Sequence, residues 1–238
     1  MKTIMFMNAK GGSGKSTLAT NLAAYYALCN CKVALADFDM QGSCMDWLSV
    51  RPQESPKIIG IPAATRSIKL PRDTEYLIMD APGAVHGRAI DRLVRRVEHL
   101  IIPVTPSPVD FRATARFIQE LLLVRQVSRS KTRVACVANR VRDVSHSYEA
   151  LERFLDRLGI PLIATLHDSD SYIKASGLGL SIFELKGDRQ AGRDQQPWHP
   201  LLRWIDGERL PPVIKNANRD MDGFRNIDRL DELELSTI

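Results

Sequence analysis

The feature that most constrains the fold is a short loop of glycine, serine and lysine near the N-terminus. Residues 10–16 have the sequence Lys-Gly-Gly-Ser-Gly-Lys-Ser. They follow an apolar run at residues 3–7 and lead into an apolar stretch with helical spacing at residues 16–28. A glycine-rich loop between a buried strand and a helix lets successive backbone N–H groups surround a phosphate, and the helix N-terminus adds positive potential. The sequence therefore predicts a phosphate-binding loop.

Short apolar runs recur along the chain and predict the rest of the sheet. Such runs occupy residues 33–36, 76–79, 100–104, 134–138 and 162–164, and helical patterns occupy 88–97, 111–127 and 146–158. Continuous apolar strands that alternate with helices indicate a parallel sheet covered on both faces. We therefore expect an α/β fold of the P-loop NTPase type, with a mostly parallel twisted sheet and helices on both faces.

Composition limits the other possibilities. Apolar residues make up 44% of the 238 residues and charged residues 26%, as in ordinary soluble domains. The four cysteines form no disulfide framework, and no apolar run reaches the ~20 residues of a membrane span. We expect a cytoplasmic protein with a single domain, built around the phosphate loop, over residues 1–205 that ends in a helix near Trp198. Residues 50–75 are proline-rich and predict a connection with little regular structure, and residues 206–238 predict a loop and a short acidic helix.

The residues of the loop predict its chemistry. Lys15 is expected to neutralise the β- and γ-phosphates of a nucleotide, and the Ser16 hydroxyl is expected to bind Mg²⁺. The predicted ATP-binding residues are Gly11, Gly12, Ser13, Gly14, Lys15, Ser16 and Thr17.

The spacing of the loop departs from the common phosphate-loop pattern. Ala9 stands where the first glycine is expected, and an additional lysine, Lys10, follows it. This form resembles the deviant Walker A motif of the ParA/MinD family of dimeric ATPases. The resemblance implies that Lys10 reaches the nucleotide phosphates of a partner subunit. There, a second ammonium group offsets the charge that develops on the γ-phosphate. Lys10 and Lys15 are therefore predicted catalytic residues, together with Asp39, whose motif is described next.

Two aspartates support this resemblance. The segment that starts at Asp37 resembles the family's Asp-x-Asp-Pro-Gln motif, which implies that Asp39 positions the attacking water, although Met40 replaces the proline. The segment that starts at Asp80 resembles the Walker B region, which implies that Asp80 holds Mg²⁺ through water. Both segments follow predicted strands, and ligands of open α/β sheets bind at such carboxyl ends.

The resemblance as a whole spans roughly residues 2–187. Two further segments in this range resemble ParF-type partition ATPases or the wider family. The run from Pro103 to Phe111 is similar to a proline-rich dimerisation segment, in which Pro106 and Pro108 would stiffen the loop at an interface. Asn139 follows a predicted strand at the place where the family contacts adenine. The resemblance thus implies a homodimer that forms with ATP.

Basic residues are concentrated in one part of the chain. Residues 88–142 contain twelve basic and four acidic residues, a net +8 in a chain whose total is +5. Such concentration favours contacts to DNA phosphates without base recognition, although a solvated helix surface remains the alternative. The predicted DNA-binding residues are Arg125, Arg129, Lys131 and Arg133, with Lys174 from a segment that also resembles the ParF branch.

The resemblance, together with the basic segment, implies an ATPase that requires ATP and Mg²⁺, dimerises, binds DNA nonspecifically, and positions a cargo over the nucleoid. The cargo would be a plasmid, a chromosome locus or a protein body such as the carboxysome, as for the similar McdA proteins, and a small adaptor protein would stimulate hydrolysis. One alternative is a MinD-like membrane ATPase, which the acidic residues 224–235 disfavour because anionic lipid repels them. Another is a small-molecule P-loop kinase or ligase, which Lys10 disfavours. We expect no membrane partner.

Overall fold

The computed structural model describes residues 1–95, 97–124, 127, 131–142 and 146–207. Its centre is one sheet with the strand order β3-β2-β4-β1-β5-β6-β7, in which every neighbouring pair is parallel. The strands are β1 (Lys2–Phe6), β2 (Val33–Asp37), β3 (Ile58–Pro62), β4 (Tyr76–Asp80), β5 (His99–Val104), β6 (Arg133–Val141) and β7 (Leu162–His167). The predicted parallel α/β sheet is confirmed.

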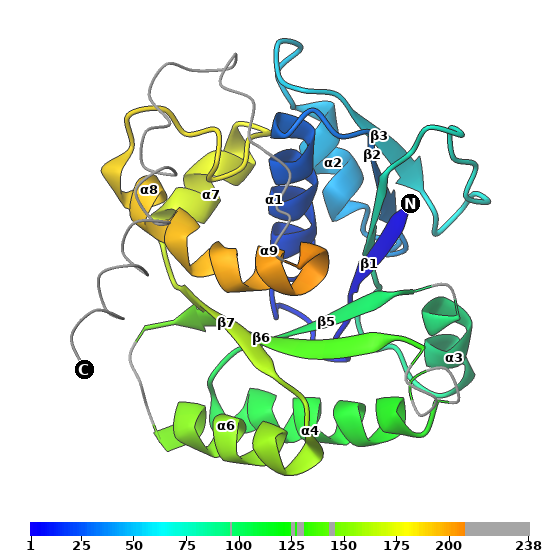
Figure 1. The fold of residues 1–238 in the computed structure, drawn as a ribbon, viewed down its shortest axis with the longest axis vertical. Coiled ribbons are helices and arrows are strands. Elements are labelled where there is room, and N and C mark those ends of the chain that lie inside the picture. Colours follow the sequence, from blue (N-terminus) through cyan, green and yellow to red (C-terminus); the bar gives the residue numbers. More distant parts are fainter. Residues whose placement is uncertain (96, 125–126, 128–130, 143–145, 208–238) are drawn as a thin grey trace.

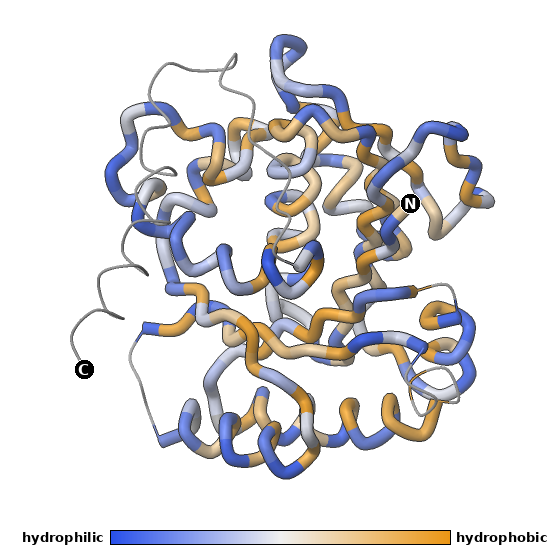
Figure 2. The backbone as a smooth tube through the Cα atoms, in the orientation of Figure 1, coloured by the Kyte–Doolittle hydropathy of each residue, from blue (hydrophilic) through white to orange (hydrophobic). Residues whose placement is uncertain are grey.

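Helices cover both faces of this sheet (Figure 1). They are α1 (Lys15–Leu28), α2 (Ser43–Ser49), α3 (Arg88–Val94), α4 (Pro108–Leu122), α6 (His146–Leu158), α7 (Asp170–Gly177), α8 (Arg189–Gln195) and α9 (His199–Asp206), with a 3₁₀ turn at Gln196–Trp198. Successive β1 side chains alternate between the two cores: Phe6 packs on the side of α1 and α9, and Met5 on the side of α3, α4 and α6. Because both faces are buried, the strands are apolar throughout, and Figure 2 shows hydrophilic colour mainly on the outer turns and loops.

The structure corrects one expectation about regular structure. Residues 50–75 are not wholly irregular, because β3 lies within them and pairs with β2 from Val33↔Ile58 to Asp37↔Pro62. β3 is the edge strand of the sheet, and an edge strand tolerates a proline at its end because one side of its backbone needs no partner. The short helices α2, α7 and α8 were also not predicted, since seven or eight residues show too little periodicity.

The helices predicted within the described part of the chain are present, but the start of α4 differs from its predicted position. Helix α4 begins at Pro108 rather than at residue 111, because the Ser107 side chain accepts a hydrogen bond from the Asp110 N–H and proline suits the first helical position. The helices expected at 146–158 and near Trp198 are present as α6 and α9. The predicted acidic helix falls within residues 208–238, outside the described residues, and the single domain over residues 1–205 stays a prediction.

Candidate nucleotide-binding site

The phosphate loop, residues 10–16, connects β1 to α1 at the carboxyl ends of the parallel strands. Gly12 and Gly14 have φ angles of 74° and 91°, in the left-handed region that glycine adopts without strain. Gly14 is also the N-cap residue of α1, so the loop ends where the backbone N–H groups of the helix are unpaired. The predicted residues 11–17 thus form a loop and a helix N-terminus suited to an anion.

Lys15 is buried at the base of this loop. Its ammonium group donates to the Lys10 carbonyl over 3.3 Å. Burial lowers the pKa of Lys15, and the nearby carboxylates of Asp80 and Asp39 partly oppose this effect. A phosphate bound in the loop would favour the charged form of Lys15 in the same way, so the site is prepared for an anion.

Ser16 and Asp80 come together from α1 and the end of β4. The Ser16 hydroxyl donates to Asp80 Oδ2, while the fully buried Oδ1 has no hydrogen-bond partner among the described residues. Burial raises the pKa of Asp80 to about 6. A hydroxyl and an unpaired carboxylate oxygen are the hard donors that Mg²⁺ prefers, so these residues fit the ion that the sequence predicts.

The surroundings of Asp80 include a residue that the sequence analysis did not single out. The Cys44 thiol, on α2, donates to Asp80 Oδ2 over 3.3 Å, and its backbone N–H donates to Asp37 Oδ2 over 2.8 Å. Asp37 also accepts the Asp39 N–H. Because α2 was not predicted, no sequence pattern indicated that Cys44 would lie here. Asp37 and Cys44 therefore hold the two aspartate-containing loops against each other.

Asp39 connects its own loop to the loop that follows β4. Its Oδ1 accepts the Gln41 N–H over 3.0 Å, and its Oδ2 accepts the Gly83 N–H over 3.1 Å. The adjacent Met40 is 76% exposed. The carboxylate of Asp39 is thus oriented by two backbone donors, a fixed position from which it can orient a water molecule.

Lys10 lies at the rim of the phosphate loop. Its ammonium group is 3.3 Å from Asp110 Oδ1, and its side chain is 41% exposed. Asp110 is in the first turn of α4, within the predicted dimerisation segment from Pro103 to Phe111 that also contains Pro106 and Pro108. The structure therefore brings Lys10 and that segment together within one chain.

A cavity of about 920 Å³ adjoins the loop. Residues from the first turn of α1, the segment after β5, β6 and α7 line it, among them Thr17, Thr105, Pro106, Asn139 and Tyr172. Asn139 is buried, and its Nδ2 donates to the Ser13 carbonyl over 2.9 Å. A Cβ on Gly14 would lie 2.1 Å from that nitrogen, which only a glycine avoids. Asn139 therefore contacts the phosphate loop itself, and its predicted contact with adenine stays a prediction.

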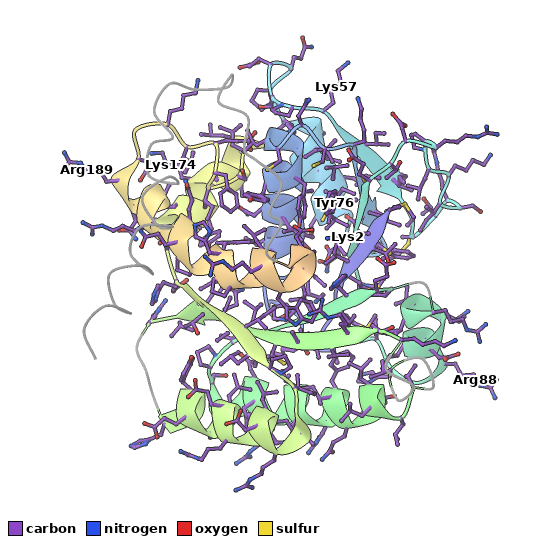
Figure 3. The ribbon with its side chains drawn as sticks, viewed as in Figure 1. Lys2, Lys57, Tyr76, Arg88, Lys174 and Arg189 are labelled. Carbon is purple, nitrogen blue, oxygen red and sulfur yellow. The ribbon has the colours of Figure 1, made fainter. Side chains whose placement is uncertain are left out.

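The predicted DNA-binding residues are distributed over different edges of the sheet. Arg133 lies at the amino end of β6, with its guanidinium 4.6 Å from the Trp204 ring centroid and a hydrogen bond to His99. Lys174 follows the carboxyl end of β7 and pairs with Asp188 over 2.8 Å. Figure 3 shows Lys174 on α7 far from Arg88 on α3.

Of the remaining predicted DNA-binding residues, only Lys131 lies within the described part of the chain. Lys131 is exposed just before β6, and Arg125 and Arg129 lie outside the described residues. Lys131 and Arg133 lie where β6 begins, at the amino ends of the parallel strands. The phosphate loop and Lys174 follow the carboxyl ends, so Lys131 and Arg133 do not share a surface with Lys174. Any DNA contact by these residues stays a prediction.

Comparison with known proteins identifies the family. The model of the CobQ/CobB/MinD/ParA nucleotide binding domain matches residues 4–182. The chain belongs to this family. The match begins in β1 and ends after α7, so the ParA/MinD-type domain includes the phosphate loop, both aspartate-containing loops and the cavity.

Individual relatives agree with this assignment. The chain is 26% identical over 200 residues to the "Maintenance of carboxysome distribution protein A" of Halothiobacillus neapolitanus, covering 81% of this chain and 92% of the relative. A solved complex of a Cyanothece McdA variant with ATP has a TM-score of 0.67 at 16% identity, covering 84% of this chain and 96% of that one.

Two more solved structures share the fold. A putative plasmid partition protein of Borrelia burgdorferi, bound to AMPPNP, has a TM-score of 0.64 at 15% identity, covering 86% of this chain and 99% of that one. The septum site-determining protein MinD of Pyrococcus horikoshii, complexed with Mg-ADP, has a TM-score of 0.61 at 16% identity, covering 87% and 96%. Among the described residues of this ParA/MinD-family chain, no helix is both long and apolar enough to cross a membrane.

Proposed function

We propose that this chain is a ParA-like positioning ATPase that dimerises with ATP and hydrolyses it slowly until a partner protein stimulates it. The observation that supports this most directly is the position of Lys10. The phosphate loop has its own buried cation in Lys15, while Lys10 lies half-exposed at the rim, where a second subunit can approach. A lysine that served only its own nucleotide would point into the loop.

In this proposal, the described residues bind the phosphates of ATP and position the attacking water. The loop N–H groups and Lys15 hold the phosphates of ATP, and Ser16 and Asp80 would hold Mg²⁺, Asp80 through water. When bound there, Mg²⁺ would supply positive charge that offsets the negative charge of the phosphates. Asp39, held by the Gln41 and Gly83 N–H groups, orients the attacking water towards the γ-phosphate. Lys10 of the second subunit offsets the charge that develops there.

The names of the relatives support proposals for the cargo and the partners. The name of the Halothiobacillus relative supports a carboxysome as cargo, and the Borrelia relative supports a plasmid. In either case we propose that the ATP-bound dimer lies on the nucleoid in the cytoplasm, binds DNA of any sequence, and is released by a small adaptor protein.

The test of the ATP-dependent dimer is light scattering after gel filtration, with ATP, ADP or no nucleotide. The wild type should form a dimer only with ATP. Lys15→Ala should stay monomeric because it no longer binds nucleotide, which a fluorescent ATP analogue measures independently. Lys10→Ala should bind the analogue but dimerise poorly. A chain that stays monomeric with saturating ATP, or that is a dimer whatever the nucleotide, would reject the proposal and would favour a small-molecule kinase or ligase.

The test of DNA binding is a filter-binding titration with salt on two unrelated duplexes. Binding should require ATP, and the logarithm of the affinity should fall linearly with the logarithm of salt, by about 0.9 per phosphate contact. Replacing Arg125, Arg129 and Arg133 with alanine should flatten that slope and leave the basal ATPase nearly intact. Equal DNA binding with ATP and ADP would contradict the proposed dependence of DNA binding on ATP. A strong preference for one duplex would indicate a sequence-specific repressor.

A further inference from the structure

Helix α4 contacts the phosphate-loop segment at two points, one helical turn apart. Asp110 and Thr114 are separated by four residues, so they lie on the same face of α4. Asp110 pairs with Lys10, and Thr114 Oγ1 accepts a hydrogen bond from Asn8 Nδ2 over 3.1 Å. This face of α4 is therefore directed at the residues that open the phosphate loop.

Asn8 makes the inner of the two contacts rigid. It is 1% exposed, and its Nδ2 also donates to the Pro103 carbonyl at the end of β5 over 2.8 Å. Its Oδ1 accepts the Lys10 N–H over 3.1 Å. One buried amide thus joins the backbone of Lys10 to β5 and α4, so the base of the Lys10 side chain has a fixed place relative to Asp110.

Asp110 is itself held in position to receive the ammonium group. Its backbone N–H donates to the Ser107 side chain, which caps α4, and its carboxylate lies in the first turn, where the helix dipole stabilises a negative charge. Its side chain is 18% exposed against 41% for Lys10. The carboxylate is therefore the fixed member of the pair, and Lys10 is the member that can leave.

We propose that Asp110 is the counter-ion that holds Lys10 within its own chain before dimerisation, and that dimer formation exchanges Asp110 for phosphate oxygens of the partner's nucleotide. This inference rests on the proposed ATP-dependent dimer. Each Lys10 must break one ion pair before it can cross the interface, so the pair opposes dimerisation and limits it to chains whose partner offers a phosphate.

The size of the effect follows from the exposure of the pair. Partly exposed ion pairs change an equilibrium constant by about two- to fivefold. A dimer requires two such pairs to break, so removing both should tighten the dimer by roughly tenfold in Kd. The charge is essential to this argument, so a variant that keeps the shape of Asp110 but not its charge is the appropriate test.

The experiment compares Asp110→Asn with the wild type by analytical ultracentrifugation over a range of protein concentrations with saturating ATP. Asp110→Asn should tighten the dimer by roughly tenfold in Kd, while Asp110→Glu should stay close to the wild type. Asp91→Asn is the matched control, because Asp91 lies on α3 and pairs with Arg95, away from the phosphate loop, and it should change nothing. In a Lys10→Ala background, Asp110→Asn should have no effect, since the group it restrains is gone.

A second measurement examines the nucleotide-free chain directly. Limited acylation of lysines, followed by mass spectrometry, should label Lys10 faster in Asp110→Asn than in the wild type. Lys174, which pairs with Asp188, should be labelled at the same rate in both and serves as the internal reference. Unchanged labelling of Lys10 would overturn the proposed pairing whatever the dimer does.

The outcomes separate the two proposals. If the wild type dimerises with ATP and Asp110→Asn leaves the Kd unchanged, the inference about Asp110 fails and the proposed function stands. If Asp110→Asn weakens the dimer, Asp110 acts across the interface and the inference also fails. If neither protein dimerises with ATP, the proposed function fails and the inference fails with it.

Discussion

Asn139 Nδ2 donates a hydrogen bond to the Ser13 carbonyl over 2.9 Å, although the two residues are 126 positions apart. The bond ties the end of β6 to the centre of the phosphate loop. Gly14 makes it possible, because any Cβ at that position would occupy the place of the Asn139 amide. A residue expected to contact adenine is therefore also in a position to hold the loop in shape.

This relationship predicts the behaviour of Asn139→Ala. The Ser13 carbonyl would lose its buried donor, at a cost of about 1–3 kcal/mol, so ATP affinity should fall by one to two orders of magnitude. If Asn139 acts through the loop, ADP and GTP should weaken by the same factor as ATP. Isothermal titration with the three nucleotides measures this, and a selective loss of adenine nucleotides would instead support direct contact with the base.

Asp39→Ala should separate binding from turnover. The loop after β4 loses one backbone contact at Gly83, but the phosphate contacts stay, so the variant should bind ATP and form a persistent dimer. Phosphate release should fall by at least about 100-fold, because the water loses the group that orients it. The control is Asp46→Ala, an exposed position on α2. A monomer that still hydrolyses ATP would reverse the role assigned to Asp39.

Glu184→Gln should destabilise the fold. Glu184 and Arg51 form a buried ion pair, at 2.7 Å between Oε1 and Nη2, with side chains 7% and 6% exposed. The Arg51 guanidinium also lies 5.1 Å from the Trp47 ring centroid, which anchors α2. Leaving that cation without its partner costs about 3–5 kcal/mol in the free energy of unfolding. Urea denaturation measures the change.

The matched control for this variant is Asp168→Asn. Its partner, Arg142, has a side chain that is 83% exposed, so the loss should stay below about 1 kcal/mol. Equal losses for the two variants would mean that burial of the Arg51 pair has no energetic consequence.

His99 should make stability depend on pH. Arg133 donates to its Nε2, so the proton of the neutral ring is on Nδ1, and burial lowers the pKa of His99 from 6.5 to about 4. Arg133 and Lys2 add to this lowering, while Glu98 and Asp206 oppose it. Between pH 6.5 and about 4 the unfolded chain binds a proton that the folded chain does not. The contribution of His99 to the free energy of unfolding should therefore fall by up to about 3 kcal/mol as the pH drops through this range, while Asp80, whose pKa burial raises to about 6, contributes in the opposite direction.

The measurement is the free energy of unfolding by urea at several pH values. His99→Phe cannot bind that proton, so the difference in the free energy of unfolding between this variant and the wild type should change as the pH drops through this range. His146→Gln, at a fully exposed position on α6, should behave like the wild type. Identical slopes for His99→Phe and the wild type would mean that His99 is protonated in the folded chain.

The sequence alone determined which segments became the central strands and where the phosphate is held. A strand that is buried on both faces is continuously apolar, so it can be recognised without knowing which strands lie beside it. The ability to adopt the left-handed region is likewise a property of glycine itself and does not depend on its neighbours. Strands β1 and β4 and the loop that ends at Ser16 could therefore be predicted from local patterns. The edge strand β3, Ile-Ile-Gly-Ile-Pro, was missed because its glycine and the prolines in and around it are typical of an irregular connection.

Only the tertiary structure decided which residues meet at the site. Lys10 and Asp110, Asn8 and Thr114, and Asn139 and Ser13 are each about a hundred positions apart or more. Their contacts depend on the strand order, which places β1 between β4 and β5, and on the packing of α4 against the face of the sheet that Met5 of β1 shares. Local patterns do not encode such an order, because several arrangements of the same strands bury the same apolar faces. The packing of the whole chain selects one of them, and with it the partners of each polar side chain.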